Sequence, residues 1–196
     1  MSLASLLTRS QWGIDAPLVH VEVHLGAGLP AFQLVGMADT GVRESRERVR
    51  AAIEHCGLRF PAGRLTVNLA PAEFPKEGGH YDLPLALGIL AAADEFDSTA
   101  LQDVEFYGEL ALDGTLRADA GLLVAAVRAA EAGHRLVVPR DSLPTVLAVP
   151  GLVAAGAGHL GEVLDHCRGT ARLEFRQRGS AVPAPPPRLP ELAEVQ

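Results

Sequence analysis

This sequence of 196 residues has few cysteines, no long apolar run and no leader-like start. The two cysteines, Cys56 and Cys167, are too few for a disulfide framework or a zinc cluster. No apolar stretch reaches the roughly 18 uncharged residues that a membrane span needs. The first residues also lack the basic segment and long apolar core of a signal peptide. We therefore expect a cytoplasmic protein that makes no contact with a membrane.

Positive charge is also scarce. The net charge is −7, and Lys76 is the single lysine beside sixteen arginines. Non-specific coating of nucleic acid depends on clustered lysine and arginine, so any nucleic-acid contact has to be a local patch. A phosphate-binding loop of the form Gly-x4-Gly-Lys-Ser/Thr is excluded, because no glycine loop precedes Lys76. The sequence thus predicts no nucleotide site and no cofactor within this chain.

What the sequence does contain is a regular succession of strand and helix patterns. Alternating or continuous apolar runs predict strands at 3–9, 18–25, 31–35, 64–69, 104–112, 135–138, 152–155 and 173–175. Apolar residues at helical spacing predict helices at 39–56, 83–93, 120–132, 142–148 and 159–167. The turn at 26–30 suggests that residues 17–35 form a hairpin. The mixture predicts an α/β fold, with helices packed on a mixed sheet.

A single domain is predicted over residues 1–178, followed by a proline-rich linker at 179–196. The run Ser180-Ala-Val-Pro-Ala-Pro-Pro-Pro-Arg-Leu-Pro190 cannot form a helix or a central strand and is typical of an extended linker. We expect such a linker to lead into a further module of a longer protein.

Basic residues gather on the helix predicted at 39–56. Arg43, Arg46 and Arg50 are three and four residues apart, so they share one ridge that can touch phosphates. With Lys76 they are the candidate nucleic-acid-binding residues of the sequence.

The same helix allows a second interpretation. Arg43 and Glu47, and likewise Glu44 and Arg48, are spaced for i,i+4 ion pairs. Such pairs are typical of a solvated helix face without a binding role.

A short strand face carries possible metal ligands. His20, Glu22 and His24 alternate along the strand predicted at 18–25 and therefore share one face. This is also the ordinary polar face of a half-solvated strand, and no fourth ligand is evident. We predict no metal site.

The loop before the second helix holds the richest set of polar residues. Its members are Pro75, Lys76, Glu77, Gly78, Gly79, His80 and Asp82. Loops held between rigid elements often carry function. The structural interpretation is that Asp82 caps the following helix and the glycines permit a tight turn. The two interpretations are compatible.

Several segments resemble one known family. They are Val67-Asn-Leu-Ala-Pro-Ala-Glu-Phe-Pro-Lys-Glu-Gly-Gly-His-Tyr-Asp-Leu-Pro-Leu-Ala-Leu-Gly-Ile-Leu90, Val21-Glu-Val-His-Leu25, Gly28-Leu-Pro-Ala-Phe-Gln-Leu-Val-Gly36 and Gly108-Glu-Leu-Ala-Leu-Asp-Gly-Thr-Leu-Arg117, with a weaker match at 159–163. Together they look like the N-terminal domain of the ComM/YifB family of magnesium-chelatase-like AAA+ proteins. The resemblance implies a Lon-protease-like fold.

The Lon comparison also bears on catalysis. Lon-type proteases carry a nucleophilic serine after a Pro-Lys-Asp-Gly loop and a partner lysine further on. Laid on this chain, His80 takes the place of the serine and Leu123 that of the lysine. Acyl transfer then lacks its nucleophile and base, so we predict no catalytic residues. The main alternative is a Lon-type peptidase with a displaced nucleophile. A small-molecule kinase of related fold is a weaker one, because no convincing phosphate loop is present.

The resemblance further implies what the longer protein does. The family's motor module would follow the linker, bind ATP and Mg²⁺, and assemble into a hexamer on single-stranded or branched DNA. Its role would be helicase or branch-migration activity in recombination during natural transformation. We expect this chain to be a non-catalytic binding or assembly module that forms hexamers only together with the motor module.

Overall fold

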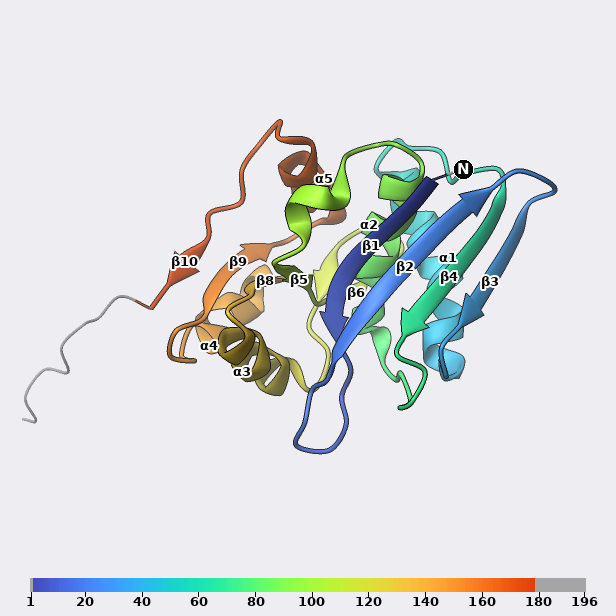
Figure 1. Ribbon diagram of the computed structural model, residues 1–196. Helices are drawn as coiled ribbons and strands as arrows, with labels where there is room; N and C mark the ends of the chain where they lie inside the picture. The colour runs from blue at the N-terminus through green and yellow to red at the C-terminus, as the bar shows by residue number, and fades with distance from the viewer. Residues whose placement is uncertain (1, 179–196) are drawn as a thin grey trace, which may run out of the picture.

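A mixed eight-stranded sheet organises the chain (Figure 1). The structure is a computed structural model that describes residues 2–178; the predicted linker at 179–196 lies outside the described residues. The strands follow one another across the sheet as β10-β9-β8-β5-β1-β2-β4-β3. Their bounds are β1 Ser2–Arg9, β2 Leu18–Gly26, β3 Ala31–Val35, β4 Arg64–Ala70, β5 Val104–Phe106, β8 Arg135–Pro139, β9 Val153–Ala157 and β10 Arg176–Gln177. A separate ribbon pairs β6 (Glu109–Leu110) with β7 (Leu116–Arg117).

Helices pack on both faces of this sheet. The α-helices are α1 Thr40–His55, α2 Asp82–Ala92, α3 Leu122–Ala132, α4 Leu143–Val146 and α5 Leu160–Arg168, and the 3-10 turns are η1 Gly79–Tyr81, η2 Ser98–Leu101 and η3 Arg140–Ser142. Strand β8 separates two cores: Val137 packs with α1, α2 and α5, while Leu136 and Val138 pack with α3 and α4. Successive side chains of a strand point to opposite faces, so the two helix groups cover opposite faces.

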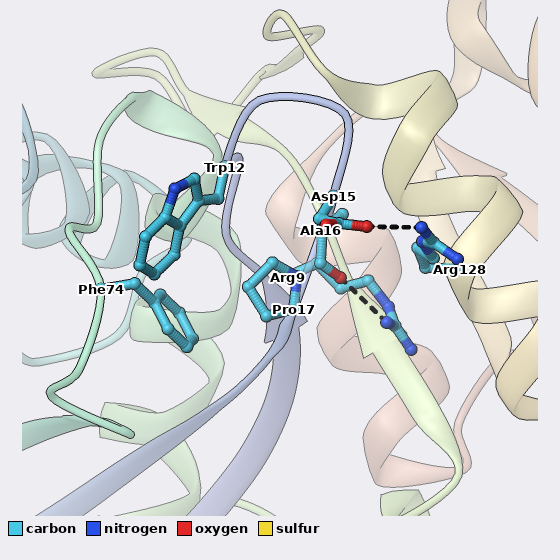
Figure 2. A pocket seen from close by; sticks show the side chains of 7 residues that line it. All are labelled: Arg9, Trp12, Asp15, Ala16, Pro17, Phe74 and Arg128. Carbon is cyan, nitrogen blue, oxygen red and sulfur yellow. Dashed lines mark hydrogen bonds and ion pairs between the residues drawn. The ribbon is translucent and has the colours of Figure 1, made fainter.

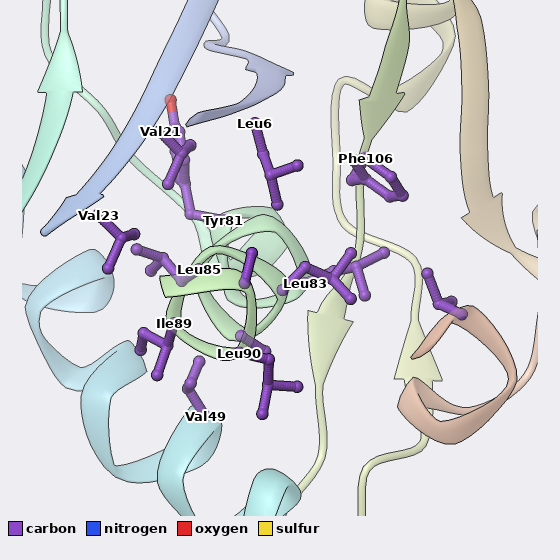
Figure 3. Close-up of a cluster of buried hydrophobic side chains, with 14 of the residues drawn as sticks. Leu6, Val21, Val23, Val49, Tyr81, Leu83, Leu85, Ile89, Leu90 and Phe106 are labelled. Carbon is purple, nitrogen blue, oxygen red and sulfur yellow. The ribbon is translucent and has the colours of Figure 1, made fainter. Parts of the chain in front are cut away.

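The larger core surrounds α2, which is buried at every residue (Figure 3). Such a helix needs apolar residues on all sides, which explains its uniformly apolar sequence. Gly88 lets the helix approach the sheet closely, since a Cβ there would lie 2.7 Å from Val23 Cγ2. No helix within residues 2–178 is long and apolar enough to cross a membrane.

The predicted hairpin at 17–35 is wrong. Strand β4 lies between β2 and β3: it pairs antiparallel with β2 and parallel with β3. The reason is the α1 connection. A strand–helix–strand crossover brings β3 and β4 together as parallel neighbours, and β2 is left to pair with the far side of β4.

The other predicted elements are present with small shifts. The strand predicted at 104–112 is broken into β5 and β6: Tyr107 N still donates to Val137 O of β8, but Gly108 N donates to His80 O outside the sheet. Residues 173–175, predicted as an edge strand, are not in a strand; the edge strand β10 comprises the two residues that follow them. The α/β fold with a mixed sheet and packed helices is confirmed.

Candidate functional site

The polar loop 75–82 is attached by its backbone to the start of α1. Lys76 N donates to Met37 O at 3.1 Å, and Asp39 N donates to Lys76 O at 3.0 Å. Ser10 Oγ donates to Pro75 O at 2.9 Å, which ties the loop to the end of β1 as well. Three segments that are distant in sequence therefore meet at this loop.

The side chain of Lys76 points into the protein. It is fully buried, and its Nζ donates to the carbonyls of Phe74, at 2.8 Å, and Pro71. The ammonium also lies 4.2 Å from the centre of the Phe74 ring. Burial lowers the pKa of this lysine. A phosphate on the surface cannot reach Lys76 in this position, so its predicted grouping with Arg43, Arg46 and Arg50 is wrong.

His80 is fully buried between two aromatic rings. Its ring stacks on Tyr107 at 4.2 Å with an interplanar angle of 3°, and it lies 4.2 Å from the ring of Tyr81. Nδ1 is 3.0 Å from Asp119 Oδ2, and Nε2 is 2.9 Å from Arg9 O. The histidine thus joins the loop to β1 and to the segment before α3.

Asp119 accepts more than one hydrogen bond from this loop. The backbone N–H of His80 also donates to Asp119 Oδ2, at 3.1 Å. The hydrogen bond from His80 is the largest influence that lowers the pKa of Asp119, from 3.8 to about 2. A carboxylate with these partners stays ionised over the whole neutral range.

The two glycines leave space for carboxylates. A Cβ at Gly78 would lie 2.5 Å from Asp119 Oδ2, and a Cβ at Gly79 would lie 2.5 Å from Glu109 Oε2. Gly78 also has a φ of 95°, which favours glycine. The remaining charged member of the loop, Glu77, is exposed. The glycine pair is therefore explained by packing.

Asp82 does not cap α2, contrary to the prediction. The N-cap residue is Tyr81, without a side-chain cap bond. The buried Asp82 carboxylate instead accepts from Arg48 Nε at 2.7 Å, from Arg48 Nη2 at 3.0 Å and from Leu110 N at 3.1 Å. Burial raises the pKa of Asp82, and the hydrogen bond from Arg48 opposes that rise.

The sequence does not identify Arg48 as a site residue, because its i,i+4 spacing predicts an ion pair with Glu44 on the helix surface. Asp82 indicates that such a partner exists, since an aspartate at the start of an otherwise apolar, buried helix requires a cationic or hydrogen-bonding partner. Neither the Glu44–Arg48 nor the Arg43–Glu47 ion pair forms within residues 2–178.

The geometry of His80 also bears on the peptidase alternative. A nucleophile and its base lie within hydrogen-bond reach of each other. Within residues 2–178, no hydroxyl or thiol hydrogen-bonds to His80, and the nearby Ser10 hydroxyl bonds to a backbone carbonyl. Leu123, at the position of the Lon lysine, is half-exposed on α3. This arrangement brings no nucleophile and base together.

The exposed basic residues lie on the other side of α1. Arg43, Arg46 and Arg50 are all exposed. Arg50 pairs with Glu54 at 3.0 Å, and Arg46 approaches Glu47 at 3.8 Å. We call these three arginines the α1 ridge.

The ridge borders aromatic side chains. The guanidinium carbon of Arg46 is 5.6 Å from the centre of the Phe32 ring, and that of Arg50 is 5.7 Å from the centre of the Phe60 ring. Both are within the range of cation–π contacts.

The strand face of His20, Glu22 and His24 forms as predicted, on the side of β2 opposite α2. Asn68 Nδ2 donates to Glu22 Oε2 at 2.8 Å. Within residues 2–178, no group of three or more histidine, cysteine, aspartate or glutamate side chains is placed to hold a metal ion.

A hollow of about 410 Å³ lies beside the β1–β2 loop (Figure 2). Trp12 and Phe74 line one side, with ring centres 5.4 Å apart. Arg128 on the other side pairs with Asp15 at 2.5 Å. The second arginine, Arg9, pairs with the buried carboxylate of Glu105 at 2.6 Å. Both positive charges are thus matched by carboxylates, and the hollow offers little attraction to phosphate.

Comparisons with known proteins agree with the resemblance. Residues 21–142, more than half of the chain, match the family described as "Subunit ChlI of Mg-chelatase". The chain is 42% identical over 182 residues to "Uncharacterized protein YifB" of Escherichia coli K12, which covers 93% of this chain and 36% of that protein. It is 46% identical over 142 residues to "Competence protein ComM" of Haemophilus influenzae, covering 72% of this chain and 28% of that protein.

The chain spans about a third of the length of these curated relatives. The matched residues include the motif loop and the 108–117 segment, on which the resemblance depended. The likeness to Lon stays a prediction. The chain belongs to the ComM/YifB family of Mg-chelatase-like proteins.

Proposed function

We propose that the chain is a non-catalytic binding module of a longer ComM-like protein, and that its α1 ridge contacts DNA. The observation that carries the proposal is the ridge itself. Arg43, Arg46 and Arg50 are exposed side by side on one helix, whereas Lys76 and Arg48 are directed to internal partners. A protein of net charge −7 binds phosphates through such a local patch.

One relative carries the name "Competence protein ComM", and we take a role in competence as the starting point for the proposal. We infer that the longer protein carries an AAA+ motor, which binds ATP and Mg²⁺ and forms a hexamer. That motor would act on single-stranded or branched DNA as a helicase in recombination. In such an assembly this chain would present its α1 ridge to the DNA.

The loop 75–82 has a supporting role in this proposal. The backbone of Lys76 and the side chains of His80 and Asp82 join this loop to the start of α1, to β1, to α1 itself and to Asp119 through hydrogen bonds. The loop therefore fixes the position of α1 on the sheet. We expect the chain alone to hydrolyse neither ATP nor peptides, and a peptidase activity lost on His80→Ala would contradict this.

DNA binding is tested by fluorescence anisotropy with labelled oligonucleotides over a range of salt concentrations. The variant Arg43→Ala/Arg46→Ala/Arg50→Ala removes the ridge. The slope of log K against log salt is negative, and each lost phosphate contact reduces its magnitude by about 0.7 to 0.9. We expect weaker binding, and a slope smaller by roughly two units if all three contacts form.

The matched control removes the same charge far from the ridge. Arg135, Arg140 and Arg176 lie in or beside β8 and β10, toward the opposite edge of the sheet from β3 and α1. Their triple change to alanine should leave the salt slope nearly unchanged. Equal loss of binding in both variants would show a general charge effect and would contradict the proposed ridge.

A further inference from the structure

A small hollow of about 160 Å³ lies against the α1 ridge. It is formed by the start of β3, the 60–63 loop and α1, and its walls include Pro30, Phe32, Phe60 and Pro61 together with Arg46 and Arg50. The hollow therefore combines flat apolar surfaces with two of the three ridge arginines.

Both arginines lie over aromatic rings in this hollow, Arg46 over Phe32 and Arg50 over Phe60. Their side chains are 44% and 50% exposed, so the guanidinium groups are accessible from outside. Nucleic-acid bases stack on aromatic rings and on the planar faces of guanidinium groups. The two pairs thus provide two stacking surfaces one helical turn apart.

Further positive charge surrounds the hollow. Arg59 precedes Phe60, and Arg64 pairs in the sheet with Ala31 at the start of β3. Both are exposed, and neither makes an ion pair within residues 2–178. They add positive charge beside the start of β3 and the 60–63 loop, which form part of the hollow.

We propose that this hollow is a binding site for single-stranded DNA, which takes unstacked bases against Phe32, Phe60 and the two guanidinium planes. Arg43, Arg59 and Arg64 contact the neighbouring phosphates. The proposal rests on the proposed function and adds the residues of this chain that hold the bases of a single strand.

The choice of single strands over duplex follows from the charges on α1. Glu47 and Glu54 stand beside Arg46 and Arg50 and offset part of their charge, so phosphate contacts alone give a weak site. Stacking supplies the remaining affinity, and only bases outside a duplex expose their faces to a protein side chain. A duplex could use the phosphate contacts but not the hollow.

The test compares a labelled 20-nucleotide dT strand with a 20-base-pair duplex by anisotropy. We expect the wild-type chain to bind the single strand at least about tenfold more tightly. In Phe32→Leu/Phe60→Leu the apolar bulk remains but the ring faces are lost. Stacking on an aromatic ring contributes roughly 1 to 3 kcal/mol per base, so the single-strand affinity should fall about tenfold or more. The salt slope should stay the same, because the phosphate contacts remain.

A second variant does not depend on the half-buried phenylalanines. Arg46→Lys/Arg50→Lys keeps both charges but removes the guanidinium planes, and it should also weaken binding of the single strand more than that of the duplex. The matched control is Phe175→Leu, because Arg135 lies over the Phe175 ring at 5.0 Å far from β3. It should leave both affinities unchanged.

The outcomes separate this inference from the proposed function. Equal binding of the two DNA forms, with unaltered affinity in both double variants, would overturn the stacking site while the ridge proposal stands. Absence of binding to either DNA form at low salt would overturn both. Loss of duplex and single-strand binding by the same factor in Arg46→Lys/Arg50→Lys would also overturn the stacking site.

Discussion

Buried charges are the residues on which the stability of this domain depends most directly. Arg9 at the end of β1 donates to both carboxylate oxygens of Glu105 on β5, at 2.7 and 2.6 Å. His134 Nδ1 lies 2.8 Å from the same carboxylate. The Glu105 side chain is 1% exposed, so it cannot exchange these partners for water.

We expect Glu105→Gln to destabilise the protein by about 3 kcal/mol or more. The change leaves Arg9 buried without its counter-charge, and breaking a buried ion pair from one side typically costs 3–5 kcal/mol. Urea unfolding followed by circular dichroism measures the loss. Asp103→Asn is the control, because it removes the largely exposed pair with Arg135 and should cost less than about 1 kcal/mol. Similar losses in the two variants would contradict the buried-pair argument.

The lowered pKa of Asp119 predicts a pH-dependent contribution to stability. A carboxylate whose pKa is lower in the folded than in the unfolded protein binds fewer protons when folded. Its contribution is therefore complete above about pH 5 and is lost as the pH falls through 3.8 toward 2. The shift from 3.8 to about 2 corresponds to roughly 2 kcal/mol.

The measurement is the stability difference between wild type and Asp119→Asn at a series of pH values. It should be near 2 kcal/mol at pH 6 and shrink toward zero at pH 2. Glu77→Gln, which removes an exposed carboxylate of the same loop, serves as the control. If the difference in unfolding free energy between wild type and Asp119→Asn stays constant with pH, the ionised form of Asp119 does not stabilise the fold through His80.

Among the single elements, helix α1 has one face that is buried in the core and one that is exposed. Val42, Val49 and Ile53 pack into the larger core, and Arg48 on the adjoining side reaches Asp82. The α1 ridge faces solvent. Because one helix carries both the buried apolar residues and the α1 ridge, the packing of α1 on the core determines the position of the ridge.

The start of α1 depends on Asp39. Its Oδ1 accepts from Val42 N at 2.7 Å, and aspartate is a preferred N-cap residue. We expect Asp39→Ala to lower stability by about 1 kcal/mol. Asp39→Asn keeps the acceptor oxygen and should lower the free energy of unfolding by only a few tenths of a kcal/mol. Thermal unfolding of both variants checks this, and equal losses would mean that the cap bond contributes little.

At the scale of the whole molecule, the chain closes its own cores within residues 2–178. Both sheet edges are short, with five residues in β3 and two in β10, and short edges discourage pairing with another copy. The most exposed apolar side chains, Leu3, Ile14 and Leu29, come from separate segments.

We therefore expect the chain alone to be a monomer at micromolar concentration. Hexamers should require the motor module that we propose for the longer protein, because a ring built by an ATPase needs nucleotide at its subunit interfaces. Light scattering with and without ATP and Mg²⁺ checks this expectation. A stable hexamer of the chain without nucleotide would instead place the assembly contacts in this domain.

The sequence by itself determined the elements and the family. Helix α1 and the apolar helix α2 follow from spacings and residue types within a few positions of each other. The motif at 67–90 led to the family because it is a continuous run of residues. The exposure of the α1 ridge was also predictable, since Arg43, Arg46 and Arg50 avoid the apolar stripe of their helix.

Contacts between segments that are distant in sequence became apparent only in the folded structure. The position of β4 between β2 and β3, the inward turn of Lys76, the Asp82–Arg48 pair and the contact of His80 with Asp119 join residues that no local spacing relates. Periodicity reports whether a residue faces a core or solvent, but it carries no information about which other segment supplies that core. Partners for buried charges depend on the path of the whole chain, because desolvation makes each buried charge take whichever opposite charge the fold brings near.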